Sequence, residues 1–202
     1  MSNRKRLLFA ALGMVVMAAL AAVALLVVAP WNEDRIADSL GHGDYRLVTT
    51  DGGTFTEASL TGTPSAVFFG YTHCPDVCPT TLGEISAWQD ELGQEGKELR
   101  VFFVTVDPER DTSDLLRDYV SWVPGVTGVT GDRAEIDKAI KAFRIYAKKN
   151  QQEDGEYFMD HTATVLLFDA QGRMFEPIGY QEDVDRAVAK LRRLLNGERA
   201  DS

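Results

Sequence analysis

The sequence predicts an α/β domain built on a mainly parallel sheet. Two short apolar runs, Ala66 to Phe69 and Val101 to Val106, show no alternation of polar and apolar residues. This pattern is typical of strands that are covered on both faces. Between them, apolar residues recur at helical spacing from Leu82 to Leu92, and Gly93 ends that segment. A strand, a helix and a second strand in this order predict a β-α-β unit.

The middle of the chain continues this alternation of helices and strands. Asp111 to Trp122 is expected to form a second helix, and Val126 to Thr130 a short strand. A third helix is expected to start at Asp132, with Glu135 three residues further on. This spacing is the capping-box pattern, in which two side chains satisfy backbone N–H groups at the helix start.

The C-terminal part predicts a hairpin followed by a helix. Thr162 to Asp169 forms one expected strand, Arg173 to Ile178 the next, and Val184 to Leu195 an amphipathic helix. Val48 to Thr56 adds an expected N-terminal hairpin, whereas Lys148 to Phe158 has no clean period and is interpreted as a loop or a β-excursion. The complete order of elements is that of a thioredoxin-like fold.

The N-terminal segment predicts a membrane anchor. Leu7 to Ala29 is an uncharged run of 23 residues, preceded by three basic residues at 4–6 and closed by Pro30. A helix of that length spans roughly 34 Å, which is enough to cross a hydrocarbon core of about 30 Å. A cleavable signal has a shorter apolar stretch of about 7–15 residues, so a retained transmembrane helix is favoured, although Val27-Val28-Ala29 is a passable cleavage site.

The basic residues before the anchor predict its orientation. Basic flanks stay on the cytoplasmic side, so the rest of the chain is expected on the exported, periplasmic or extracytoplasmic, side of the inner membrane. The expected organisation is a cytoplasmic N-terminus at 1–6, a transmembrane helix at 7–29, a tether at 30–44, one α/β domain at 45–196 and a tail at 197–202.

The charge of the exported part excludes one class of partner. All 31 acidic residues but only 18 of the 21 Lys and Arg lie beyond the anchor, which gives this part a formal charge of −13. Binding to a phosphate backbone depends on clustered Lys and Arg. We therefore expect no nucleic-acid partner, and contact with the membrane only through the N-terminal helix.

Cys74 and Cys78 are the only two cysteines of the chain. Pro75 and Pro79 follow them and disfavour a continuous helix through the pair. We expect Cys78 near a helix N-cap with Pro79 at the first helical position, and Cys74 in the preceding loop. A helix N-terminus favours the thiolate, so the pair suits a structural disulfide, a redox-active thiol pair or a soft metal ion.

A structural disulfide is the least favoured of these alternatives. A bridge between residues four apart closes a very short loop, and the stabilisation by a disulfide grows with loop length. A metal site needs a third donor, and the histidines of the chain are His42, His73 and His161. His161 directly precedes a predicted strand, which could bring it to the sheet edge beside the cysteines. Two thiolates and one imidazole suit Cu(I), whereas zinc would require a fourth ligand such as Asp76 or Asp160.

Three segments together resemble the Sco/SenC family. They are Phe69-Gly70-Tyr71-Thr72-His73-Cys74-Pro75-Asp76-Val77-Cys78-Pro79, Val106-Asp107-Pro108-Glu109-Arg110-Asp111-Thr112 and Asp160-His161-Thr162, behind an N-terminal anchor. The resemblance covers roughly Tyr45 to Leu195. It implies a membrane-tethered, thioredoxin-like copper chaperone that helps to build the binuclear copper site of cytochrome c oxidase.

The resemblance also implies the site residues and partners. Cys74, Cys78 and His161 would be the copper ligands, for Cu(I) or Cu(II), and the two cysteines would also form a thiol–disulfide redox pair. The implied partner is the copper-site subunit of the oxidase, together with other copper carriers or thiol reductants. The segment from Asp107 to Asp111 receives no chemistry, and its carboxylates are interpreted as shaping a turn.

A thiol–disulfide reductase is the main alternative function. It would keep cysteines of the oxidase reduced so that another carrier could supply the metal. Two features weaken a general thioredoxin-type exchanger: three residues separate Cys74 from Cys78 instead of two, and Ala163 stands where thioredoxins place a cis-proline. A peroxiredoxin is excluded because its Pro-x-x-x-Thr-x-x-Cys motif does not lead into Cys74. A copper or redox sensor is a weaker third alternative.

Overall fold

The computed structural model describes residues 12–23, 38–152 and 155–198. The chain divides into two compact units, Met1–Asp38 and Ser39–Ser202. In the first unit residues 12–23 form a helix. No helix within the described ranges is both long and apolar enough to span a membrane. The anchor expected at 7–29 extends beyond these ranges and stays a prediction, and residues 1–6, 30–37 and 199–202 of the expected flanking segments lie outside them.

The second unit contains the last residues of the expected tether. Leu40 is buried in the hydrophobic core, and the hydroxyl of Tyr45 donates a 2.7 Å hydrogen bond to the carbonyl of Gly41. Gly41 has a positive φ of 80°, and a Cβ there would lie 2.7 Å from the side chain of Leu60. The folded unit thus includes residues 39–44, ahead of the domain start expected at Tyr45.

Within the described residues, seven strands form one mixed sheet with the order β2-β1-β5-β4-β3-β8-β9. Its three central strands, β5, β4 and β3, are parallel, and every other pair of neighbouring strands is antiparallel. The strands are β1 (Leu47–Thr49), β2 (Thr54–Phe55), β3 (Ser65–Gly70), β4 (Arg100–Thr105), β5 (Val126–Thr130), β8 (Val165–Phe168) and β9 (Met174–Ile178). The predicted α/β architecture is confirmed, but the sheet is not mainly parallel, because four of its six strand pairs are antiparallel.

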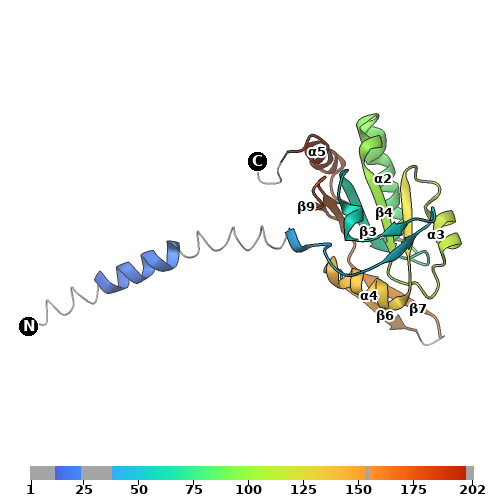
Figure 1. Cartoon of the computed structure of the whole chain (residues 1–202), viewed down its shortest axis with the longest axis horizontal. Helices are drawn as coiled ribbons and strands as arrows, with labels where there is room; N and C mark the ends of the chain where they lie inside the picture. Colours follow the sequence, from blue (N-terminus) through green and yellow to red (C-terminus); the bar gives the residue numbers. More distant parts are fainter. Residues whose placement is uncertain (1–11, 24–37, 153–154, 199–202) are drawn as a thin grey trace, which may run out of the picture. The chain divides into compact units, whose positions relative to one another are not determined.

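Helices cover both faces of this sheet (Figure 1). The helices are α2 (Val77–Leu92), α3 (Ser113–Val120), α4 (Arg133–Ala142) and α5 (Val184–Leu195), with short 3-10 turns η1 (Glu57–Leu60) and η2 (Glu95–Glu98). Helices α2 and α5 pack on one face, and α4 lies on the other. Neighbouring residues of β3 point to opposite faces of the sheet. The ring of Phe69 packs against Phe143 at the end of α4, whereas the ring of Phe68 packs against Phe103 of β4.

Helix α4 starts where the sequence predicts, but without the expected capping box. Asp132 is the N-cap residue, and its side chain makes no capping hydrogen bond. Glu135 instead accepts a 2.7 Å bond from the backbone N–H of Arg46 and a 2.7 Å bond from Lys138. The carboxylate therefore ties the helix to the N-terminal part of the unit rather than to its own first turn.

Strands β6 (Ala147–Gln151) and β7 (Tyr157–His161) form a separate two-stranded sheet. Ala147 pairs with His161 at one end, and Gln151 pairs with Tyr157 at the other. This hairpin occupies the segment that has no clean sequence period, so a β-excursion is the better of the two interpretations. His161 ends β7 and does not lie directly before β8, which starts at Val165.

Two glycines test the packing of the sheet against its helices. A Cβ on Gly128 of β5 would lie 2.7 Å from Thr50 and 2.8 Å from Leu116, whereas a Cβ on Gly83 of α2 would meet nothing within 4 Å. We expect Gly128→Ala to lower the free energy of unfolding by about 1–3 kcal/mol through overpacking. Gly83→Ala should raise it by up to about 1 kcal/mol, because alanine favours a helix interior. Urea unfolding measures both values, and equal changes in the free energy of unfolding for the two variants would contradict this packing.

Candidate metal site

The cysteine loop begins where β3 ends, at the carboxyl edge of the parallel strands. Gly70 is the last residue of β3, and a Cβ there would lie 2.7 Å from the sulfur of Cys78 and 2.8 Å from the ring of Phe103. Real Cβ contacts are essentially never that short. Glycine at this position therefore makes the space in which the Cys78 side chain lies.

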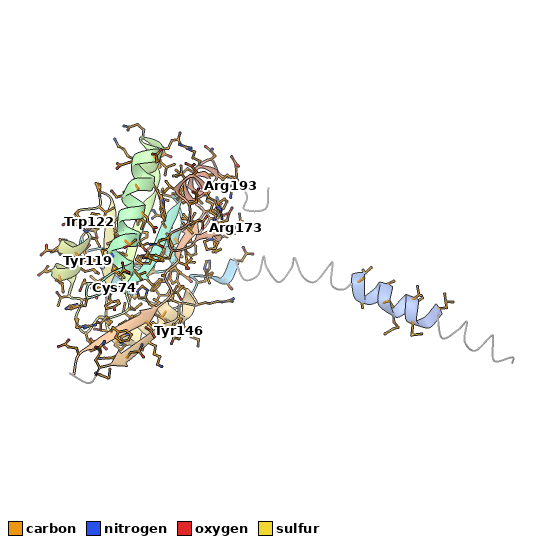
Figure 2. All side chains as sticks on the ribbon, turned by 180° about the vertical axis from the view of Figure 1, so that it is seen from behind. Cys74, Tyr119, Trp122, Tyr146, Arg173 and Arg193 are labelled. Carbon is orange, nitrogen blue, oxygen red and sulfur yellow. The ribbon has the colours of Figure 1, made fainter. Side chains whose placement is uncertain are left out.

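The two cysteines lie on either side of the start of α2. Asp76 is the N-cap residue, so Cys78 is the second residue of the helix, and Cys74 lies in the preceding loop. Pro79 was expected at the first helical position, but it is the third residue of the helix. The backbone N–H of Cys78 points to the sulfur of Cys74 at 3.4 Å. Figure 2 shows Cys74 at this end of α2.

His161 comes from the far end of the β6–β7 hairpin and meets both cysteines. Its Nε2 lies 3.4 Å from the sulfur of Cys78. The two sulfurs and one ring nitrogen all lie within 4.8 Å of one another. Donors that bind one ion at about 2.0 Å (nitrogen) and 2.3 Å (sulfur) are roughly 3.5–3.8 Å apart at ordinary coordination angles. The three side chains could therefore hold one ion with small adjustments.

The imidazole of His161 is oriented by the backbone of the next residue. Its Nδ1 lies 3.0 Å from the carbonyl oxygen of Thr162. A carbonyl oxygen only accepts, so Nδ1 carries a proton and donates it to Thr162, and Nε2 is the ring nitrogen that faces the sulfurs. The rings of Phe68 and Tyr71 face the imidazole edge to face, with centroids at 6.1 and 5.8 Å. These contacts fix the orientation of the ring.

The two thiols have opposite electrostatic environments. A hydrogen bond with the Cys78 side chain, together with weaker ones from His161 and nearby backbone groups, lowers the pKa of Cys74 to about 4. The same contact and the burial of the side chain raise the pKa of Cys78. Cys74 is half-buried and Cys78 is fully buried. At neutral pH the metal-free site therefore holds one accessible thiolate and one protected thiol.

The other candidate donors lie elsewhere. Nδ1 of His42 lies 3.6 Å from Glu57, and Nδ1 of His73 lies 3.0 Å from the hydroxyl of Thr72. Asp76 accepts a 3.4 Å bond from Thr80. Among the described residues, Cys74, Cys78 and His161 form the one group of three His, Cys or acidic side chains close enough to share an ion. Neither Asp76 nor Asp160 joins it, so a fourth ligand for zinc is absent from this group.

The family model described as SCO1/SenC matches residues 33–196 of the chain. This chain belongs to the SCO1/SenC family. The family assignment agrees with the three segments that carry the resemblance in the sequence, and all three lie within the matched range.

Solved Sco structures share the fold of this chain. The structure of Bradyrhizobium japonicum ScoI with copper bound is 43% identical, with a TM-score of 0.70, and the match covers 77% of this chain and 99% of that one. Yeast Sco1 with copper bound is 32% identical, with a TM-score of 0.70, over 78% of this chain and 89% of that one. The thioredoxin-like fold of the Sco family is therefore shown for this chain.

Curated Sco relatives are longer proteins. "Protein SCO1 homolog 1, mitochondrial" of Arabidopsis thaliana is 34% identical over 145 residues, which are 71% of this chain and 43% of that protein. The human "Protein SCO1 homolog, mitochondrial" is 31% identical over 79% of this chain and 54% of its own length. The chain thus spans about half the length of the curated Sco relatives it matches.

The segment from Asp107 to Asp111, which is one of the three that resemble the Sco family, supports the cysteine loop through hydrogen bonds. Asp111 is buried and accepts bonds from Thr72, at 3.1 Å from its backbone N–H and 2.6 Å from its hydroxyl, and a 2.5 Å bond from Thr105. These bonds hold the start of the cysteine loop on the end of β4. From the sequence, the carboxylates of this motif were interpreted only as shaping a turn. The motif does not indicate that Thr72 and Thr105 are hydrogen-bond partners of Asp111.

The thiol environments predict a pH dependence of alkylation. In the reduced, metal-free protein Cys74 should react with iodoacetamide as a thiolate, and its rate should fall only as the pH falls through about 4. Cys78 should stay unreactive at neutral pH. In Cys78→Ala the main hydrogen bond is lost, so the midpoint for Cys74 should move upward. Peptide mass spectrometry would measure both rates, and a shared midpoint near the ordinary thiol pKa of 9.0 would contradict this assignment.

Proposed function

We propose that this protein binds one copper ion through Cys74, Cys78 and His161 and delivers it to the copper-site subunit of cytochrome c oxidase. One observation carries the proposal: the three donor atoms lie within 4.8 Å of one another, with Nε2 of His161 turned to the sulfurs. Membership of the family and the copper bound in similar Sco structures support the choice of metal.

The donor set favours copper over harder or higher-coordinate ions. Thiolates are soft ligands that select Cu(I), and a third, imidazole donor suits Cu(II) as well. Calcium and magnesium require oxygen ligands, and structural zinc requires four donors. Two sulfurs would hold Cu(I), and the imidazole would matter most for Cu(II).

Delivery requires that a partner can reach the ion. Cys74 is half-buried at the mouth of the site, whereas Cys78 is enclosed by Gly70 and the core. An incoming ligand of the partner would therefore replace Cys74 first, and the ion would leave last from Cys78. We further propose that the segment 7–29 anchors the protein in the inner membrane, with the second unit on the exported side, where the oxidase copper site would be accessible.

A thiol–disulfide reductase is the second candidate, and the unequal thiols favour it. A low-pKa thiolate at the mouth of the site, beside a buried thiol, is the arrangement of an attacking and a resolving cysteine. In this alternative the protein would reduce a disulfide of the oxidase, and no ligand role of His161 would be needed. A metal-bound thiolate cannot also be in a disulfide, so the two activities would compete.

Copper binding tests the proposed ligand set. The reduced protein should bind one copper ion, and Cys74→Ser or Cys78→Ser should lower Cu(I) affinity by more than the roughly 10–100-fold typical of a lost supporting contact. His161→Ala should weaken Cu(II) binding more than Cu(I) binding. His73→Ala is the matched control, because its ring is next to Cys74 but bonded to Thr72. Competition with a chromogenic chelator measures the affinities, and tight binding that survives in all three ligand variants refutes the site.

His161→Ala also separates the two candidate functions. A reductase needs only the two thiols, so this variant should reduce a disulfide in an oxidase copper-site fragment within about threefold of the normal rate. Copper transfer to the reduced fragment should fall at least roughly tenfold. The opposite result, with copper transfer intact and disulfide reduction lost, would mean that the imidazole is not needed as a copper ligand, and it would contradict the proposal.

A further inference from the structure

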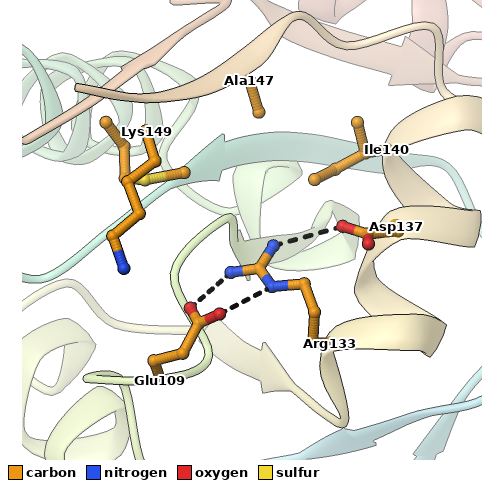
Figure 3. A pocket seen from close by; sticks show the side chains of 7 residues that line it. Glu109, Arg133, Asp137, Ile140, Ala147 and Lys149 are labelled. Carbon is orange, nitrogen blue, oxygen red and sulfur yellow. Dashed lines mark hydrogen bonds and ion pairs between the residues drawn. The ribbon is translucent and has the colours of Figure 1, made fainter. Parts of the chain in front are cut away.

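The β6–β7 hairpin that carries His161 needs support from outside itself. It is not part of the seven-stranded sheet, and an isolated two-stranded hairpin is marginally stable in water. A pocket of about 370 Å³ lies between the hairpin and α4 (Figure 3). Its lining residues are Glu109, Arg133, Asp137, Ile140, Ala147, Lys149 and Met159. Over this area the hairpin does not pack tightly against the helix, so other contacts must hold it.

Arg110, in the loop after β4, joins the hairpin to the body of the domain. Its Nε donates a 2.5 Å bond to Asp107, and one terminal nitrogen donates a 3.1 Å bond to the carbonyl of Tyr157. The guanidinium also lies 3.6 Å from the centroid of the Tyr157 ring and 5.8 Å from that of Tyr71. Arg110 therefore contacts the start of β7 and the cysteine loop at the same time.

Asp107 completes this connection from the core. It is fully buried, and it accepts a 2.8 Å bond from the hydroxyl of Tyr157 in addition to the bond from Arg110. Burial and the neighbouring carboxylate of Asp107 raise the pKa of Tyr157 to about 12, so the hydroxyl keeps its proton and remains the donor. A buried, charge-assisted pair of this kind is stronger than an exposed ion pair.

The contacts of Arg110 and Asp107 with Tyr157 are connected to His161 through strand β7 and the side chain of Tyr71. Tyr157 and His161 are the two ends of β7, and the backbone of Met159 between them makes a hydrogen bond with Tyr71. The ring of Tyr71 in turn meets the imidazole of His161 at 90°. Arg133, in contrast, is held by Glu109, Asp137 and the carbonyl of Val106, and among the described residues it makes no hydrogen bond to the hairpin (Figure 3).

We propose that Asp107, Arg110 and Tyr157, here called the hairpin latch, are positioning residues that hold His161 against the two cysteines. The latch does not touch the ion. It keeps the hairpin docked, and so it sets how often the imidazole is within bonding distance of the sulfurs. The inference rests on the proposed copper site for its effect on binding, but the docking of the hairpin can be measured without metal.

Hydrogen exchange of the metal-free protein tests the docking. Arg110→Lys keeps the charge but loses the planar contacts, and Tyr157→Phe keeps the ring but loses the bond to Asp107. Both should speed exchange of amides in 147–151 and 157–161 about tenfold, while the amides of β3 and β4 stay unchanged. Arg117→Lys and Tyr45→Phe are matched controls, because Arg117 also binds a carboxylate and a backbone carbonyl, and Tyr45 also donates to a buried acceptor, away from the hairpin.

Copper titration of the same variants tests the consequence for the site. Loss of supporting contacts should lower Cu(II) affinity roughly tenfold in the latch variants, with Cu(I) affinity within about threefold. The nitrogen hyperfine coupling in the Cu(II) electron paramagnetic resonance spectrum should weaken in parallel. A general loss of stability would not produce this difference between the two oxidation states.

The outcomes separate the latch from the proposed function. Unchanged hairpin exchange in both latch variants, or equal changes in the controls, overturns the latch whatever the copper result. If the unsubstituted protein binds no copper, the proposed function fails, while hydrogen exchange still decides whether the latch exists. If Arg110→Lys also exposes the sheet amides, Tyr157→Phe decides the question, because it removes a single hydroxyl.

Discussion

The contact between the sulfur of Cys78 and Nε2 of His161 is the constraint on which the site depends. It joins residues 83 apart in sequence, from the start of a helix and the end of a separate hairpin. Such a contact has a high cost in chain entropy and persists only when both partners are held independently. Gly70 leaves the space for the sulfur, and the Thr162 carbonyl fixes the ring that meets it.

The two cysteine side chains are hydrogen-bonded to each other but chemically unequal. A buried, protonated Cys78 beside an ionised, half-buried Cys74 gives the site one anchored and one exchangeable donor. The same inequality suits metal transfer and disulfide exchange, because each requires a sulfur that partners can reach and another that they cannot. The position of the imidazole favours the metal role, since thiol exchange does not require a third donor.

Sequence patterns predicted the elements whose periods are local and clear. The strands around Phe68 and Phe103 and the helix Val184–Leu195 follow from apolar spacing alone. The β6–β7 hairpin has one buried residue, Met159, and no clean period, so its strands could not be distinguished from a loop. The capping box failed for a different reason, because a distant partner, the backbone of Arg46, competes for Glu135.

The site residues could be named from the sequence, but what holds them could not. Cys74 and Cys78 are conspicuous as a lone pair, whereas His161 depended on the family resemblance, because spacing alone does not bring it to the cysteines. The bonds that Thr72 donates to Asp111 and Tyr157 donates to Asp107 connect segments 39 and 50 residues apart, and no local pattern indicates them. The most direct test of the central contact is a long-range ¹H–¹⁵N spectrum of the metal-free, reduced protein in mildly alkaline solution. His161 should show a protonated Nδ1 and a fixed ring, whereas an unprotonated Nδ1 or a freely averaging ring would contradict the account.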